Sequence, residues 1–164
     1  GGLELFVNDG ALAAAVMRGT DRLSSEFSVR VRGDFDESRV PELIEAAAGD
    51  TECSGRLETV EWQGGEGVNR WARGVAVGLR PRDLKRMFER CGLEANRVLR
   101  TRFGPVAMDR ALSRGRSRRL TDGELAALRE AVGFAPPRRS RVPARRGAGP
   151  RGKRAPTGSR RRDR

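Results

Sequence analysis

Basic side chains are distributed very unevenly along this chain, and that distribution limits where a fold can form. Residues 136 to 164 contain 12 of the 34 lysines and arginines and one of the 22 acidic residues. The same stretch is rich in proline, glycine and serine and has almost nothing apolar to bury, which is typical of disorder. We therefore predict a folded unit over residues 1–134 and a disordered basic tail over 135–164.

The charge also indicates the kind of partner. The formal net charge is +12, and the residues before the tail are nearly neutral. Lys85 and Lys153 are the only lysines, so most of the positive charge is guanidinium, which binds phosphate through a planar fork and stacks on bases. A polyanionic partner follows. Two interpretations of the tail stay open: a sequence-independent RNA tether, or a solvated extension without a site of its own.

Several classes of protein are unsupported by the composition. The chain has no histidine, and Cys53 and Cys91 are widely separated, so we expect no metal site and two buried thiols in a reducing cytoplasm. No apolar run reaches the roughly 18 residues of a membrane span. The chain begins with Gly1-Gly2 and not with methionine, from which we expect that native residues precede it.

Periodicity predicts an α+β fold with a mixed, mostly antiparallel sheet and a few packed helices. Phe27, Val29 and Val31 alternate with polar residues, which is the pattern of a half-buried strand. The strands expected by such arguments cover residues 2–7, 27–31, 57–62, 69–79 and 98–103. The helices expected cover residues 11–18, 38–49, 81–91 and 121–132.

Local signals refine these limits. Asn8-Asp9-Gly10 predicts a turn after the first strand, and Ser38 is the expected cap of the helix that contains Pro41. The glycines of residues 63–67 allow a phosphate cradle or a hairpin loop, and the strand that follows favours the hairpin. Thr121-Asp122-Gly123-Glu124 is a capping box.

Two basic elements are candidates for contacts with a nucleic acid. In the helix 81–91, an apolar stripe that includes Leu84 faces the core, and Lys85 falls at the border between core and solvent. In the strand 98–103, Arg100 and Arg102 are two positions apart and are expected to point the same way. They either grip successive phosphates or belong to a solvated sheet face.

The residues by themselves indicate no complete catalytic group. Triads that need histidine are absent, and the acidic pair Asp34 and Asp36 precedes a helix, where capping is the simpler explanation. Taken alone, the sequence supports a basic, single-domain α+β protein that binds RNA or DNA.

Three separated segments resemble the RsuA/RluB family of ribosomal-RNA pseudouridine synthases. Residues 2–10, Gly-Leu-Glu-Leu-Phe-Val-Asn-Asp-Gly, resemble its G-L-L-L-L-T-N-D-G segment. Residues 80–89, Arg-Pro-Arg-Asp-Leu-Lys-Arg-Met-Phe-Glu, resemble its R-N-R-Q-V-R-R-M-F-E helix. Residues 96–105 resemble its N-R-L-x-R-x-R-F/I-G-P strand, and Arg119-Leu120-Thr121 its R-x-L-T element. The Phe103-Gly104-Pro105 version favours the RluB-like members.

The resemblance implies a pseudouridine synthase-like catalytic domain whose nucleophilic aspartate falls a few residues before Gly1. The fragment itself is then expected to be inactive, and a small RNA-binding domain typical of the family would also precede it. Phe27 takes the place of the family's stacking tyrosine, and Lys85 that of the arginine that pairs with the nucleophile. The phosphate-binding residues implied are Arg80, Arg82, Arg86, Arg100 and Arg102.

This sequence departs from the family pattern at several of these places. Phe27 lacks the tyrosine hydroxyl, Ser25 replaces a lysine, Asp83 replaces glutamine and Pro81 replaces asparagine. The function implied is site-specific isomerisation of uridine to pseudouridine in ribosomal RNA by a cytoplasmic monomer without cofactor or metal. The alternatives are a non-catalytic RNA-binding or ribosome-assembly protein of the same fold, and a generic basic nucleic-acid-binding domain.

Overall fold

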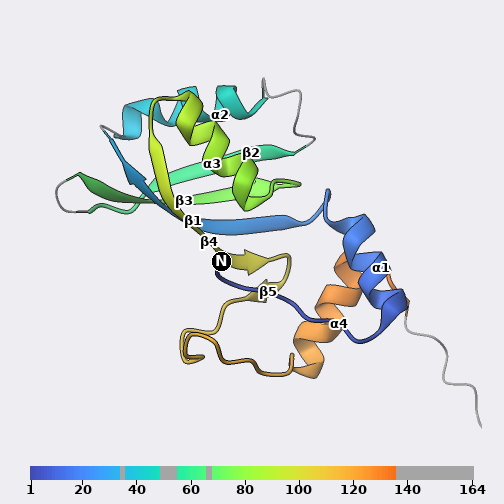
Figure 1. Ribbon diagram of the computed structural model, residues 1–164. Coiled ribbons are helices and arrows are strands. Elements are labelled where there is room, and N and C mark those ends of the chain that lie inside the picture. Colours follow the sequence, from blue (N-terminus) through green and yellow to red (C-terminus); the bar gives the residue numbers. More distant parts are fainter. Residues whose placement is uncertain (34–35, 49–54, 66–67, 136–164) are drawn as a thin grey trace, which may run out of the picture.

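The computed structural model describes residues 1–33, 36–48, 55–65 and 68–135 (Figure 1). Apart from Ala135, the predicted tail lies outside these residues, as do Asp34, Gly49, Cys53 and the last two residues of the loop 63–67. Cys91 is a buried free thiol, as expected. Within the described ranges, no helix is long and apolar enough to cross a membrane.

An antiparallel sheet forms the centre of the fold, with the strand order β2-β3-β1-β4-β5. The strands are β1 (Ser24–Arg32), β2 (Arg56–Trp62), β3 (Asn69–Val77), β4 (Glu94–Phe103) and β5 (Val106–Ala107). The alternation of buried and less buried residues along β1 follows the predicted pattern. The α+β class and the hairpin between β2 and β3 are therefore confirmed.

The first segment of the chain differs from its prediction. Residues 2–7 do not form a regular strand, and their pairing with the sheet is limited to a parallel bridge between Gly2 and Arg100. Leu3, Leu5 and Val7 are still less exposed than the residues between them, so the segment is extended and half-buried without a full ladder. Asp9 then accepts hydrogen bonds from the amides of Ala11 and Leu12. It therefore caps α1 (Gly10–Gly19).

The helices begin and end at recognisable signals. Asp36, and not the predicted Ser38, caps the short 3-10 turn η1 (Glu37–Arg39), and α2 (Val40–Ala48) continues from it. Ser38 instead donates its amide to the Asp36 carboxylate, at 2.8 Å. The remaining helices are α3 (Pro81–Arg90) and α4 (Asp122–Ala131), both as predicted.

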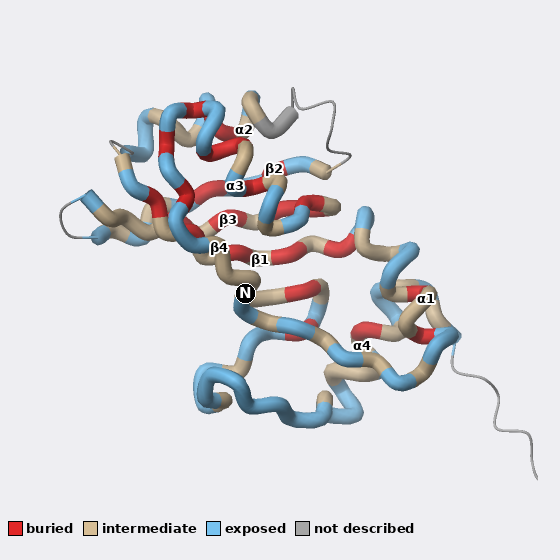
Figure 2. Tube along the Cα trace, in the orientation of Figure 1, coloured by how far each residue is buried: buried red, intermediate tan, exposed pale blue. Residues whose placement is uncertain are grey.

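The apolar side chains form two separate cores (Figure 2). In the larger core, Phe27 and its neighbours on the sheet pack against α2 and α3, whose apolar stripe contributes Leu84, Met87 and Phe88. A smaller core joins Leu23, Phe103, Val106 and Leu128 next to α1 and α4. Figure 1 shows α2 and α3 together at one end of the molecule and α1 and α4 at the other. The region between the two cores holds the candidate site.

Candidate functional site

A bulge in β4 places two of the predicted arginines on opposite faces of the sheet. Glu26 of β1 pairs with Arg102, the next residue Phe27 pairs with Arg100, and Thr101 is the extra residue between them. A bulge of this kind reverses the alternation of side chains beyond it. Arg100 therefore shares the face of Phe27, and Arg102 shares the face of Glu26. The prediction that the two guanidiniums point the same way is wrong.

Arg100 lies against two aromatic rings at the edge of the larger core. Its guanidinium carbon is 5.5 Å from the centroid of the Phe27 ring and 5.3 Å from that of Phe103. Its Nε is buried and has no hydrogen-bond partner. Burial lowers the pKa of the Arg100 guanidinium, since a charge removed from water is disfavoured. Cation–π contacts compensate in part, by about 0.5–2 kcal/mol. A half-buried cation, with no anionic partner among the residues that the structure describes, is thus the main electrostatic feature here.

The first residues of the chain run beside this arginine. The amide of Arg100 donates to the carbonyl of Gly1 at 3.1 Å, and the amide of Leu3 donates to the carbonyl of Arg100 at 2.8 Å. Gly2 has a φ of 100°, and a Cβ at this position would lie 2.4 Å from the Arg100 carbonyl oxygen. The approach of the two backbones therefore requires glycine.

An open hollow of about 330 Å³ adjoins Arg100. Arg100 and Phe103 form part of its wall, and the rest is formed by apolar residues of the first segment and of α1 together with Thr20, which caps the end of α1. Met17, which lines the hollow, is 76% exposed. A charged group next to an apolar hollow is the arrangement by which pockets orient a ligand with one anionic end.

Phe27 and Lys85 belong to elements that the larger core brings together. Phe27 is fully buried, and it belongs to the same core as Leu84, the neighbour of Lys85 in the sequence. The side chain of Lys85 is 55% exposed and its Nζ lies 3.6 Å from the Glu89 carboxylate. Lys85 thus lies on the solvent-exposed flank of α3, while the ring of Phe27 is covered.

Asp83 organises the arginines at the start of α3. Its carboxylate accepts a hydrogen bond from the Arg80 amide at 3.0 Å and lies 3.7 Å from both Arg82 and Arg86. An acidic residue in the first turn also interacts favourably with the helix dipole. The departure from glutamine at this position is therefore explained by helix capping. Arg82 remains 75% exposed and available to a partner.

Arg102 belongs to a network on the other face of the sheet. The Glu26 carboxylate lies 2.6 Å from Arg73 and 3.5 Å from Arg102, and accepts a hydrogen bond from the Thr101 hydroxyl at 3.1 Å. The hydrogen bond from Arg73 is the largest cause that holds the pKa of Glu26 below its usual range. The network ties β3, β1 and β4 together.

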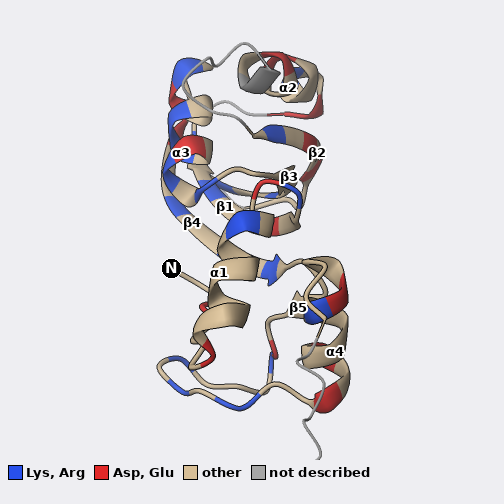
Figure 3. Cartoon of the chain, turned by 90° about the vertical axis from the view of Figure 1, so that its right-hand side faces the viewer, with Lys and Arg blue, Asp and Glu red and all other residues tan. Residues whose placement is uncertain are grey.

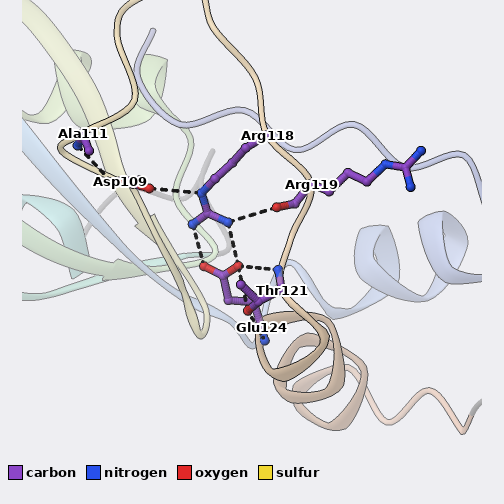
Figure 4. Close-up of polar contacts among 6 residues, drawn as sticks. All are labelled: Asp109, Ala111, Arg118, Arg119, Thr121 and Glu124. Atoms are coloured by element: carbon purple, nitrogen blue, oxygen red, sulfur yellow. Dashed lines mark hydrogen bonds and ion pairs between the residues drawn. The ribbon is translucent and has the colours of Figure 1, made fainter.

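A second ion-pair cluster precedes α4 and was not predicted. Arg118 binds both oxygens of Glu124 at 2.8 Å, and Asp109 at 3.2 Å (Figure 4). The same Glu124 completes the predicted capping box with Thr121. The hydrogen bonds from Arg118 are the largest cause that lowers the pKa of Glu124 to about 2. This cluster holds the long loop between β5 and α4 in place, so its role is structural.

Metal ligands do not gather anywhere in the parts of the chain that the structure describes. No family model matches the sequence.

Curated relatives are similar to the chain in sequence, and a solved structure is similar to it in fold. Ribosomal large subunit pseudouridine synthase B of Pseudomonas aeruginosa is 35% identical over 135 residues, which is 82% of this chain and 35% of that protein. The protein of the same name from Escherichia coli K12 is 30% identical over 141 residues, 86% of this chain and 48% of that protein. A crystal structure of pseudouridylate synthase superimposes with a TM-score of 0.56 at 20% identity, over 74% of this chain and 52% of that one.

The matches cover most of this chain but only part of each relative. The chain spans about a third to a half of the length of the curated relatives it matches. About four fifths of its own residues take part in the match. Over about four fifths of its length the chain is similar in sequence to ribosomal large subunit pseudouridine synthases B, as its resemblance to the RsuA/RluB family led us to expect.

Proposed function

We propose that the protein to which this chain belongs isomerises uridine to pseudouridine at a specific site in ribosomal RNA. The observation that carries the proposal is the position of Arg100, a half-buried cation that lies against Phe27 and Phe103 and is hydrogen-bonded through its backbone to the first residues of the chain. In the family pattern the nucleophilic aspartate comes shortly before those residues. The relatives' names support the reaction.

The proposed site must accept a base that has left its stack, because the glycosidic bond of a paired uridine is inaccessible. Phe27 can stack on such a base, but its ring is buried beneath Arg100. We therefore propose an exchange of partners, in which Arg100 leaves the rings to bind a phosphate of the everted nucleotide and the base takes its place over Phe27. A guanidinium suits this step, because it stacks on rings and also forms bidentate bonds to phosphate.

Lys85 is the proposed partner of the aspartate. Its present contact with Glu89 joins two side chains that are each about half exposed, at 55% and 51%. Such a surface pair contributes only about 0–1 kcal/mol, so Lys85 can exchange Glu89 for another carboxylate at little cost. A nearby cation keeps a carboxylate ionised, which is the state that a nucleophile needs.

The other predicted RNA contacts divide into two groups. Arg80 and Arg82 are exposed at the start of α3, where they can position the RNA backbone. Arg86 and Arg102 are only partly exposed, and each lies beside a carboxylate, that of Asp83 or of Glu26, with which an RNA phosphate would have to compete. Arg82 also lies 3.7 Å from Asp83, but its side chain is 75% exposed. Ribosomal RNA is the proposed partner. We propose further that the protein is a cytoplasmic monomer that uses neither metal nor cofactor.

The test is tritium release from ribosomal RNA that carries uridine labelled at C5, because that hydrogen is lost when the base is rejoined through C5. The protein assayed is the chain extended by its natural upstream residues, with the chain of residues 1–164 as the control. We expect release by the extended protein and none by the chain alone. Binding of ribosomal RNA by the extended protein without release would contradict the enzymatic proposal. It would favour the non-catalytic RNA-binding or ribosome-assembly protein, with which the missing hydroxyl at Phe27 also agrees.

A further inference from the structure

The face of the sheet opposite Phe27 carries a row of three side chains across its central strands. Arg30 of β1 pairs directly with Trp71 of β3 on one side and with Arg97 of β4 on the other. Side chains of directly paired residues project from the same face of an antiparallel sheet. The flanking residues Val29 and Val31 are buried in the larger core, so the row projects away from that core.

Among the residues that the structure describes, the two arginines of this row lack the acidic partners that the other arginines named on their face have. Arg73 and Arg102 are paired with Glu26, and Arg32 lies 3.9 Å from Glu94. Within the described residues, neither Arg30 nor Arg97 has an ion pair or a hydrogen bond from its side chain. Like charges that are directly opposite one another on adjacent strands destabilise a sheet. An anion that binds both guanidiniums would remove this repulsion.

We propose that this row binds a single-stranded segment of RNA, with phosphates on Arg30 and Arg97 and a base stacked on Trp71. Single-stranded RNA fits because its bases are free to stack and its backbone is anionic, and an aromatic ring beside guanidiniums is how open sheet faces bind it. Arg97 is exposed, and Arg30 and Trp71 are partly exposed. Figure 3 shows basic residues along both β1 and β4. This contact lies on the other side of the sheet from Arg100, so it is additional to the proposed catalytic site.

Tryptophan fluorescence gives a local measurement of this contact, because the basic tail contains no tryptophan. The full chain is titrated with a single-stranded oligouridylate of twelve nucleotides. Trp62 and Trp71 are the only tryptophans, and Trp62 packs against the core on the opposite face. We expect the oligonucleotide to quench wild type and Trp62→Phe but not Trp71→Phe. Equal quenching of wild type and Trp71→Phe would overturn the proposal, and this comparison holds even if Trp62→Phe does not fold.

A double substitution tests the arginines. Arg30→Ser with Arg97→Ser removes both proposed phosphate contacts, and Arg18→Ser with Arg22→Ser makes the same change of charge at exposed positions in and after α1. Loss of two contacts should lower the slope of log affinity against log salt by about 1.4, from about 0.7 for each phosphate on a single strand. The quenching should disappear only in the first double variant. Equal behaviour of the two double variants would contradict the proposal.

Inorganic polyphosphate serves as the final comparison, because it has phosphates but no bases. We expect it to bind without quenching Trp71, and quenching equal to that by the oligonucleotide would overturn the stacking contact. Tritium release is measured separately on the extended protein with the Arg30 and Arg97 substitutions. We expect the double variant to lose quenching and to keep tritium release from a short RNA. Retained quenching in this variant would contradict the proposed surface alone, whereas absence of release from the unsubstituted extended protein would contradict the proposed catalytic function alone.

Discussion

The guanidinium of Arg100 lies over the ring of Phe27, 5.5 Å from its centroid, across the pair of strands β1 and β4. The arrangement leaves the cation half-buried, with a buried Nε, and among the described residues its side chain has no hydrogen bond. A folded protein gains little from such a charge, because desolvation offsets much of the attraction to the rings. We interpret Arg100 as a residue whose position serves binding.

Replacement of Arg100 by methionine tests this interpretation. Arg100→Met keeps a long side chain over the rings and removes the charge, so we expect the free energy of unfolding to change by less than about 1 kcal/mol. We expect the affinity for ribosomal RNA to fall about tenfold or more, since a hydrogen bond to a charged group contributes roughly 1.5–3 kcal/mol. Urea unfolding and RNA titration measure the two quantities.

The matched control is Arg22→Met, which makes the same change at an exposed position before β1. Its RNA affinity should stay near that of wild type. If Arg100→Met unfolded the protein while RNA affinity per folded molecule stayed unchanged, Arg100 would be a structural residue.

Phe27→Leu separates the packing role of Phe27 from its proposed stacking role. Leucine is a smaller apolar residue in a position with no exposed surface, so we expect a loss of stability of about 1–2 kcal/mol. Stacking of a base on an aromatic ring contributes roughly 1–3 kcal/mol, so tritium release by the extended protein should fall by more than this stability loss explains. Val31→Ala, in the same core but away from Arg100, is the control. Equal effects of the two substitutions on release would contradict a stacking role.

Gly2→Ala tests the placement of the first segment. A methyl group at residue 2 would lie 2.4 Å from the Arg100 carbonyl oxygen, and the backbone there has a φ of 100°. We therefore expect a loss of about 1 kcal/mol or more in the free energy of unfolding. Gly10→Ala is the control, because a Cβ at Gly10 meets nothing within 4 Å and alanine favours the helix that begins there. Similar melting temperatures for the two variants would show that residues 1–3 do not pair with Arg100.

Glu124 predicts a dependence of stability on pH. Its pKa falls from an ordinary value of 4.5 to about 2 in the folded protein, mainly through the hydrogen bonds from Arg118. A carboxyl group with a depressed pKa stabilises the fold above its unfolded pKa, and this contribution is lost as the pH falls from about 4.5 towards 2. We expect Glu124→Gln to melt below wild type at pH 7 and the gap to close between pH 5 and pH 2. Glutamine can still complete the capping box, so a gap that is constant with pH would contradict the ion pair.

The sequence predicted the regular parts of the fold because their periodicity is local. Alternation along β1 and the apolar stripe of α3 each depend on one element and its burial, and both are confirmed. The bulge at Thr101 was missed because alternation along one strand does not reveal how many residues its partner uses. The positions of Arg100 and Arg102 depend on that register.

Caps and ion pairs were harder to predict because several residues compete for the same role. Asp36 and Ser38 are both good capping residues, and only the path of the chain decides that Asp36 accepts the hydrogen bonds. Arg118 lies six residues before Glu124, a spacing that no regular helix or strand explains. Lys85 was expected at the border between core and solvent and is instead exposed, and its role towards an aspartate stays a prediction.

The exchange of partners by Arg100 is the central claim, and the nuclear magnetic resonance of its side-chain Nε–H group tests it most directly. The resonance is assigned by its absence in Arg100→Met and is expected upfield in the free extended protein, because the group lies against the rings of Phe27 and Phe103. On addition of ribosomal RNA that contains the target uridine, we predict a downfield shift towards the position of a phosphate-bound guanidinium. An Arg100 resonance that stays in place while other arginine resonances shift would contradict the claim.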